Sequence, residues 1–302
     1  MSYIYHAMGW ILNALYQLLG YIGLGNYAYA ILLFTILVNV VFLPLTIRQQ
    51  KATAKQTALR PKLEALKAKC GDDQRRYQTE MQALYQKEKV SMMGGCWTLL
   101  IRLPFLWGVW QAIRSPLSYI WNISAEAIKS ASDALQKLSE FEGKVITELD
   151  VLHNASKLGD AAGEIGKIDT SPFRFLGMDL TQTPKFDLNF AKAELIWIIP
   201  LLAFATAMLS SVISMRMQKK TNPQAGQMGM MLLFMPLISL WIAFTVPGAV
   251  GFYWACSNLV NMVIQIFVNH FYGPYITIAR DEAKTVARRK AKENELRASE
   301  SA

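Results

Sequence analysis

Apolar residues in this chain gather into long blocks that hold almost no charge. A segment that crosses a bilayer as a helix needs about 20 predominantly apolar residues. Five blocks meet this requirement, at residues 27–47, 94–114, 194–214, 228–246 and 249–269. The pattern therefore predicts an all-α integral membrane protein with five transmembrane helices.

Only a short turn separates the last two blocks. Pro247 cannot continue a helix, and Gly248 readily adopts turn conformations. The turn predicts that these two spans form an antiparallel hairpin and pack against each other as a pair.

The first long polar segment, residues 48–93, predicts a helical hairpin. Apolar residues recur at helical spacing on both sides of the sequence CGDDQ. There, Gly71 ends one helix and Asp72 or Asp73 begins the next. The hairpin would close over a narrow apolar seam, and this pattern by itself implies no partner. The seam positions are Leu59, Leu63, Leu66, Tyr77, Met81 and Leu84.

Two further segments lie outside the apolar blocks. Residues 1–26 contain no Lys or Arg, so the positively charged start of a secretory signal is missing, and their aromatic and amide side chains predict an amphipathic helix in the outer interface. Residues 115–193 contain a helix-favouring stretch at 125–145, followed by a region up to about residue 170 that we predict to be irregular. This long connection predicts a small helical cap.

The charges of the connections orient the spans. Residues 48–93 carry eleven basic and five acidic side chains, and residues 215–227 carry three basic and no acidic ones. Residues 115–193 carry eight basic and eleven acidic side chains. Because basic connections stay in the cytoplasm, we predict an outside amino terminus and a basic cytoplasmic tail at 270–302. The net charge of +9 then reflects topology and requires no DNA or RNA partner.

The composition agrees with a membrane protein and offers no catalytic motif. Hydrophobic residues make up 53% of the chain and charged residues 18%, which is unusual for a soluble domain of this length. No phosphate-binding loop, HExxH motif or Ser-His-Asp arrangement occurs, and the three cysteines have neither disulfide nor metal-ligand spacing. The sequence predicts a protein that is not an enzyme and has no metal or cofactor.

Polar side chains nevertheless occur at helical spacing inside four of the five blocks. Hydrocarbon offers such groups no partner, so each is a functional candidate unless it merely bonds a neighbouring helix. The candidates are Thr35 and Asn39 in the first block, Thr98 and Arg102 in the second, Thr206, Ser210 and Ser214 in the third, and Asn258, Asn261 and Gln265 in the fifth.

These candidates converge on one depth. At ~1.5 Å per residue, Asn39 lies about 13 Å above the cytoplasmic edge near Arg48, and Arg102 lies about 12 Å inside the second span. Ser210 and Asn261 fall near the same level. An arginine this deep either snorkels to the headgroups or faces water. We predict a hydrophilic groove that opens to the cytoplasm and is closed by the apolar outer halves of the helices.

Three segments resemble the YidC family of membrane protein insertases, which has mitochondrial and chloroplast relatives. They are residues 59–113 in the hairpin and second span, residues 175–184 with the sequence FLGMDLTQTP, and residues 234–265 in the last two spans. Together with the first span, the resemblance covers most of the chain. Because a large amino-terminal extracytoplasmic domain is missing, the chain is similar to the shorter, Gram-positive type.

The resemblance implies a function and a set of partners. In such insertases a hydrophilic groove in the inner leaflet holds the polar part of a nascent membrane protein while its apolar segment moves laterally into lipid, without NTP hydrolysis. It implies a multi-pass protein of the bacterial cell membrane that meets nascent membrane proteins and lipid, with the ribosome, the signal recognition machinery and a Sec translocon as further candidates. Trp254 is similar to the family's aromatic residue near the groove, or else is an ordinary packing residue.

The chain departs from the family inside the groove. The family usually has an arginine where this chain has Asn39, and a glutamine where it has Arg102. The exchange predicts that Arg102 supplies the positive field that attracts acidic substrate tails, with Asn39 as its hydrogen-bonding neighbour.

Two other functions stay open. A small-solute transporter or channel would carry polar residues through the outer leaflet or show an inverted repeat with broken helices, but the stretches FLWGVW and LLAFA keep the outer halves apolar. A noncatalytic assembly chaperone for membrane complexes would use the same residues as an insertase.

Overall fold

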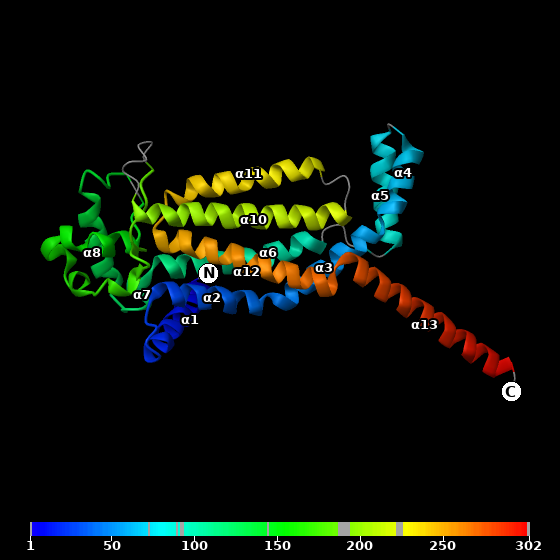
Figure 1. Ribbon diagram of the computed structural model, residues 1–302, viewed down its shortest axis with the longest axis horizontal. Coiled ribbons are helices and arrows are strands. Elements are labelled where there is room, and N and C mark those ends of the chain that lie inside the picture. Colours follow the sequence, from blue (N-terminus) through cyan, green and yellow to red (C-terminus); the bar gives the residue numbers. More distant parts are fainter. Residues whose placement is uncertain are drawn as a thin grey trace. The chain divides into compact units, whose positions relative to one another are not determined.

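The computed structural model describes residues 2–71, 73–88, 90, 94–143, 145–186, 194–221 and 226–300. At residues 2, 60, 94–102, 106, 218–221, 226–233, 281, 292, 295–296 and 298–300 it describes the backbone alone. The chain forms two compact units (Figure 1), one of Met1–Val41 and Arg102–Met262 and the other of Phe42–Ile101 and Val263–Ala302.

The first unit is mainly helical. It contains α1 (Ser2–Tyr21), α2 (Tyr27–Val41), most of α6 (Gly94–Arg114), α7 (Pro116–Tyr119), α8 (Ala125–Gln136), α9 (Glu148–His153), α10 (Ile198–Thr221), α11 (Gly226–Ala243) and the first part of α12 (Gly248–Tyr272). Its 3-10 helices are η1 (Ala155–Lys157), η2 (Gly159–Ala162), η3 (Ile165–Lys167), η4 (Ser171–Phe173) and η6 (Leu195–Trp197). Strands β1 (Arg174–Phe175) and β2 (Met178–Asp179) pair antiparallel.

Helix α10 lies between two other long helices. It runs side by side with α11 (Figure 1). It also contacts α12, because the side chain of Asn258 in α12 donates a hydrogen bond to the carbonyl of Ala203 in α10. Phe244, just after α11, packs its ring edge-on against Trp197, just before α10, with 5.3 Å between ring centroids. Among the described residues α11 therefore packs along α10 rather than along α12, and the predicted pairing of the last two spans is wrong.

The described helices include two that are long and apolar enough to cross a membrane. They are Leu195–Met217 and a stretch that starts at Gly248 and contains α12; a third span results if α2 and α3 (Leu43–Ala58) count as one. These two helices are interrupted at Phe42. Pro44, in the first turn of α3, has no N–H to bond the carbonyl of Val40, which explains the interruption of the predicted 27–47 helix. The count of five spans stays a prediction.

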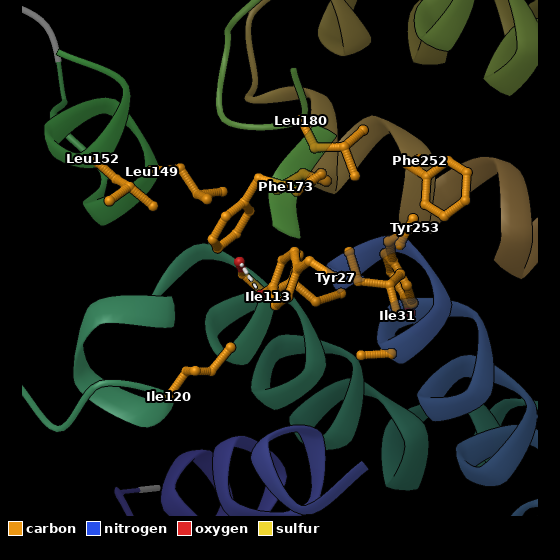
Figure 2. Close-up of a cluster of buried hydrophobic side chains, with 14 of the residues drawn as sticks. Tyr27, Ile31, Ile113, Ile120, Leu149, Leu152, Phe173, Leu180, Phe252 and Tyr253 are labelled. Carbon is orange, nitrogen blue, oxygen red and sulfur yellow. Dashed lines mark hydrogen bonds between the residues drawn. The ribbon is translucent and has the colours of Figure 1, made fainter. Parts of the chain in front are cut away.

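The core of the first unit gathers around Tyr27 (Figure 2). This side chain is fully buried, and its hydroxyl donates a hydrogen bond of 2.9 Å to the carbonyl of Ile113 in α6. The ring of Phe173 packs on Tyr27 with 4.6 Å between centroids and on Trp121 with 5.6 Å. The core thus joins the start of α2, the end of α6 and the connection 115–193.

The connection 115–193 contains more regular structure than its sequence suggests. Residues 148–153 form α9, so the prediction of an irregular region from 146 to about 170 is wrong there. Thr147 and Asp150 form a capping box, in which each side chain bonds the backbone N–H of the other residue. Leu149, Val151 and Leu152 are buried, and this burial stabilises a helix too short to be stable alone.

Glu148 is a partly buried carboxylate at the start of α9. Its two oxygens accept hydrogen bonds from the backbone N–H and the hydroxyl of Ser118, at 2.9 and 2.6 Å. Burial raises the pKa of Glu148 above its ordinary value of 4.5, and the hydrogen bonds from Ser118 oppose this only in part.

Replacing Glu148 by glutamine should remove a pH-dependent loss of stability. Because the pKa is raised in the folded protein, the contribution of Glu148 is fully present below pH 4.5 and is lost as the pH rises through the raised value. Glutamine keeps the shape and one acceptor without the charge. The unfolding temperature of the wild type should fall relative to that of Glu148→Gln as the pH rises above 4.5. A constant difference over this range would contradict the assignment.

The second unit contains α3, α4 (Arg60–Cys70), α5 (Gln74–Lys87) and α13 (Pro274–Glu300). Helices α4 and α5 form a hairpin (Figure 1) that turns where the sequence predicts it: Gly71 has φ +54°, and Asp73 caps α5 by accepting a 3.0 Å hydrogen bond from the N–H of Arg76. Helix α13 packs against α3.

Candidate functional site

The polar pair in α2 is buried. Thr35 is 1% exposed and Asn39 is 8% exposed. The hydroxyl of Thr35 donates to the carbonyl of Ile31 at 2.7 Å, and the amide NH2 of Asn39 donates to the carbonyl of Thr35 at 2.9 Å. Within the described part of the chain, the side-chain oxygen of Asn39 accepts no hydrogen bond. A buried acceptor without a donor is rare in proteins and calls for a partner such as water or a further side chain.

A second polar contact joins α10 and α12. The amide of Asn258 donates to the hydroxyl of Thr206 and to the carbonyl of Ala203, both at 3.3 Å. Thr206 is 6% exposed, and its hydroxyl donates to the carbonyl of Leu202 at 2.8 Å. This pair is a bond between neighbouring helices, so Asn258 stabilises the packing of α12 on α10 whatever else it does.

The other candidates of the first unit are half-buried. Asn261 donates to the carbonyl of Ser257 at 2.7 Å and lies 3.1 Å from its hydroxyl. Sequence reasoning missed Ser257, although its spacing of four residues from Asn261 was a usable signal. Trp254 packs against the hydrophobic core. Ser210 and Ser214 are half-buried on α10.

The polar contacts lie at similar distances from the N-terminal ends of three helices. Thr35, Thr206 and Asn258 follow the first residues of α2, α10 and α12 by eight, eight and ten positions, which correspond to about 12, 12 and 15 Å at ~1.5 Å per residue. The helix is interrupted at Phe42, between Asn39 and Arg48, so the distance predicted between them from the rise of one continuous helix does not hold. Depths are therefore counted from the N-terminal end of each helix.

Three candidates are not placed with the others. Thr98 and Arg102 belong to α6, but their side chains lie outside the described residues. Gln265 is half-buried in the part of α12 that belongs to the second unit. The contact predicted between Arg102 and Asn39 therefore stays a prediction.

No metal centre is found in the part of the chain that the structure describes. No three His, Cys, Asp or Glu side chains there are grouped closely enough to hold an ion. The candidate groups of α2, α10 and α12 named above, apart from Trp254, are amides and hydroxyls, which bind by hydrogen bonding.

Comparison with known proteins decides the family. Residues 18–274 match the family model described as 60Kd inner membrane protein. The chain belongs to the YidC family of membrane protein insertases. A Listeria innocua relative, membrane protein insertase YidC 2, is 28% identical over 272 residues, which cover 89% of this chain and 71% of the relative. An Agrobacterium fabrum relative, membrane protein insertase YidC, is 26% identical over 266 residues.

The coverage differs among the YidC relatives. The match spans 88% of this chain but only 37% of the Agrobacterium protein. A Pseudoalteromonas atlantica YidC is 40% identical over 114 residues, or 37% of this chain and 21% of that protein. Membership of this family makes the chain a multi-pass membrane protein that is not an enzyme.

Proposed function

We propose that this chain receives nascent hydrophobic segments from the cytoplasm in a hydrophilic groove and releases them laterally into the bilayer, without NTP hydrolysis. A polar segment that crosses hydrocarbon loses its hydrogen bonds to water. A groove that reaches partway through the bilayer shortens the distance over which those bonds are missing. The barrier to insertion falls, and no chemical fuel is needed.

The observation that supports this proposal is the buried side chain of Asn39, whose oxygen accepts no hydrogen bond from the residues that the structure describes. Its NH2 group bonds within α2, to the carbonyl of Thr35. A buried amide oxygen calls for a donor as well. A water-filled groove, with the guanidinium of Arg102 beside it, would provide one.

Arg102 would give the groove a positive electrostatic potential. An arginine inside a membrane span is costly unless it is hydrated or paired. Facing a hydrated groove, it would attract acidic tails of substrates and would bond Asn39. Thr35, Thr98, Ser210, Ser214, Trp254, Asn258, Asn261 and Gln265 are proposed as the remaining groove residues.

The proposal assigns the other parts of the chain to membrane compartments. Five spans run from an outside amino terminus, so that α1 lies in the outer interface and residues 115–193 lie outside. The α4–α5 hairpin and α13 then lie in the cytoplasm, in agreement with the basic excess of residues 48–93.

The α4–α5 hairpin is the proposed contact for cytoplasmic partners. An open hollow of about 450 Å³ between its two helices is lined by Ala65, Leu66, Ala83, Leu84, Lys62, Lys69, Lys87 and Glu80. A lining that joins apolar side chains with three basic ones and one acidic one suits an acidic, partly apolar partner. The ribosome, the signal recognition machinery and a Sec translocon are the candidates, together with α13.

Purified protein in nucleotide-free lipid vesicles tests the function. A short membrane protein with one apolar span and an acidic tail should become protected from external protease. A matched substrate whose span is interrupted by two charges should stay accessible. If the first substrate is protected no better than in protein-free vesicles, the chain is not an insertase of the proposed kind.

A further inference from the structure

Residues 173–182 form a small hairpin where the N-terminal ends of α2 and α12 meet. Its two strands are joined at Leu176 and Gly177, whose φ angles are +50° and +81°, and the N–H of Leu180 bonds back to the carbonyl of Phe173 at 3.0 Å. This backbone conformation is that of a tight two-residue turn. We call this element the 173–182 segment.

The 173–182 segment completes the N-terminal end of α12. The N–H of Gly248 donates to the carbonyl of Gln182 at 2.9 Å, and the N–H of Ala249 donates to the carbonyl of Leu180 at 2.8 Å. The first N–H groups of a helix have no partner inside the helix and usually turn to side chains or water. Here the backbone of another segment satisfies two of them, so water is not needed at this end.

The same segment is joined to α2 through Asn26. The side-chain oxygen of Asn26 caps α2 by accepting a 2.9 Å hydrogen bond from the N–H of Ala28. Its NH2 group donates to the carbonyl of Arg174 at 2.7 Å. One side chain thus caps α2 and also connects that helix to the hairpin.

Apolar packing fills the space between these hydrogen bonds. The ring of Phe175 lies between Tyr29 of α2 and Phe252 of α12, with centroid distances of 5.6 and 5.3 Å. Leu180 is fully buried, as Figure 2 shows beside Phe173 and Phe252. A Cβ atom added to Gly248 would lie only 3.3 Å from the backbone of Leu180, so hairpin and helix are in direct contact.

A third connection fixes the hairpin from its far side. Asp179 accepts hydrogen bonds from the N–H and hydroxyl of Thr181, at 3.0 and 2.6 Å. Its second oxygen lies 3.3 Å from the ring of His153 in α9. The 173–182 segment is therefore held by α2, α9 and α12 together.

We propose that the 173–182 segment is the permeability seal of this protein: it ties the N-terminal ends of α2 and α12 and prevents ions from passing between them. This inference rests on the proposed function, in which the polar groups about 12 to 15 Å further along these helices face water. A hydrated groove does not conduct ions across the membrane only if water is excluded from its closed end. At that end the described contacts between the 173–182 segment and the two helices are backbone hydrogen bonds, the Asn26 side chain and packed aromatic rings.

Two pairs of matched variants test the seal. Asn26→Asp keeps the oxygen that caps α2 but places a carboxylate against the carbonyl of Arg174; Asn26→Ser is the milder form. Asn154→Asp is its control, because the amide of Asn154 likewise donates to a carbonyl, that of Asp150, at 2.9 Å, and this bond does not join the 173–182 segment to α2 or α12. In Gly248→Ala the added Cβ atom meets a side-chain methyl group of Ile196 at 2.9 Å and also the hairpin backbone at Leu180, whereas in Gly251→Ala it meets only a side-chain methyl group of Ile199, likewise at 2.9 Å.

The measurement is the flux of protons and potassium through substrate-free vesicles that hold each variant. Asn26→Asp should raise the flux about tenfold, the change in open population that the loss of one such hydrogen bond produces. Gly248→Ala keeps its backbone N–H and should raise the flux because its Cβ displaces the backbone of Leu180. Asn154→Asp and Gly251→Ala should leave it at the wild-type level. Unchanged flux in the first pair, or an equal rise in the controls, would overturn the seal.

Insertion of the acidic-tailed substrate is followed in the same vesicles. We expect the seal variants to retain insertion, because none of them touches the proposed groove. Flux is recorded without substrate, so the two proposals can fail independently. If the wild type does not insert the substrate, the proposed insertase function is wrong. If the variants of the 173–182 contacts do not change the flux, the proposed seal is wrong. If Asn26→Asp does not fold, Asn26→Ser and Gly248→Ala decide the outcome.

Discussion

Replacing Arg102 by glutamine should lower the insertion of an acidic-tailed substrate by about tenfold to a hundredfold, the range expected for the loss of a charged hydrogen-bonding partner in a site of low dielectric. The guanidinium is the proposed source of positive potential in the groove. A substrate with an uncharged tail should be inserted at nearly the wild-type rate. The measurement is the protease-protected fraction of each substrate in vesicles.

A second substitution separates the charge from its position. Asn39→Arg, combined with Arg102→Gln, places the cation on α2, at the position where the resemblance to the family implies an arginine. The double variant should regain most of the insertion of the acidic-tailed substrate. If Arg102→Gln does not lower insertion, or if adding Asn39→Arg does not restore the insertion that Arg102→Gln loses, the groove charge has not been exchanged between these positions.

Replacing Phe173 by alanine should destabilise the first unit by about 3–5 kcal/mol, the usual cost of emptying the site of a buried phenylalanine. Phe173 is 1% exposed and packs on Tyr27 and Trp121, so its loss leaves a cavity where the start of α2, the end of α6 and the 115–193 connection meet. The unfolding temperature of the purified protein should fall, and residues 115–186 should become sensitive to protease.

Phe186→Ala is the matched control for this prediction. Phe186 is 59% exposed, although it too packs on aromatic rings, those of Trp197 and Phe244. The same change of side chain should therefore cost much less stability. Equal losses in the two variants would show that the cavity at Phe173 is not what matters.

Much of the helical architecture follows from local sequence. Long apolar blocks predict α10 and α12, and the Gly71–Asp73 turn predicts where α4 ends and α5 begins. These features depend on residues close together in the chain, whose propensities and caps act locally. The interruption at Phe42 was equally local, since Pro44 lacks the required N–H, but the apolar run around it hid the signal.

Other features depend on contacts between distant residues. Asn26 bonds the carbonyl of Arg174, 148 positions away, and no local pattern indicates that link. Helix α9 is short and was missed because it is stabilised mainly by burial of its leucines in a core built by other segments. The partner of α11 was predicted from a tight turn alone, whereas aromatic packing at Trp197 places it along α10.

The candidate site was predictable only in part, because its residue types are visible in the sequence but their contacts are not. Intramembrane amides and hydroxyls stand out in any apolar sequence, so Thr35, Asn39 and Asn258 could be named in advance. Which of them bond a neighbouring helix depends on side-chain geometry. Asn258 proves to bond Thr206 across two helices, while among the described residues the NH2 group of Asn39 bonds only within α2.

Solvent access to position 102 tests the hydrated groove most directly. In a background from which Cys70, Cys96 and Cys256 have been removed, Arg102→Cys should react with a water-soluble, membrane-impermeant thiol reagent added from the cytoplasmic side. Val40→Cys, on the 54% exposed and apolar side of α2, should stay protected and serves as the control. Reaction at position 102 with protection at position 40 is the result we predict; complete protection at position 102 would contradict the groove.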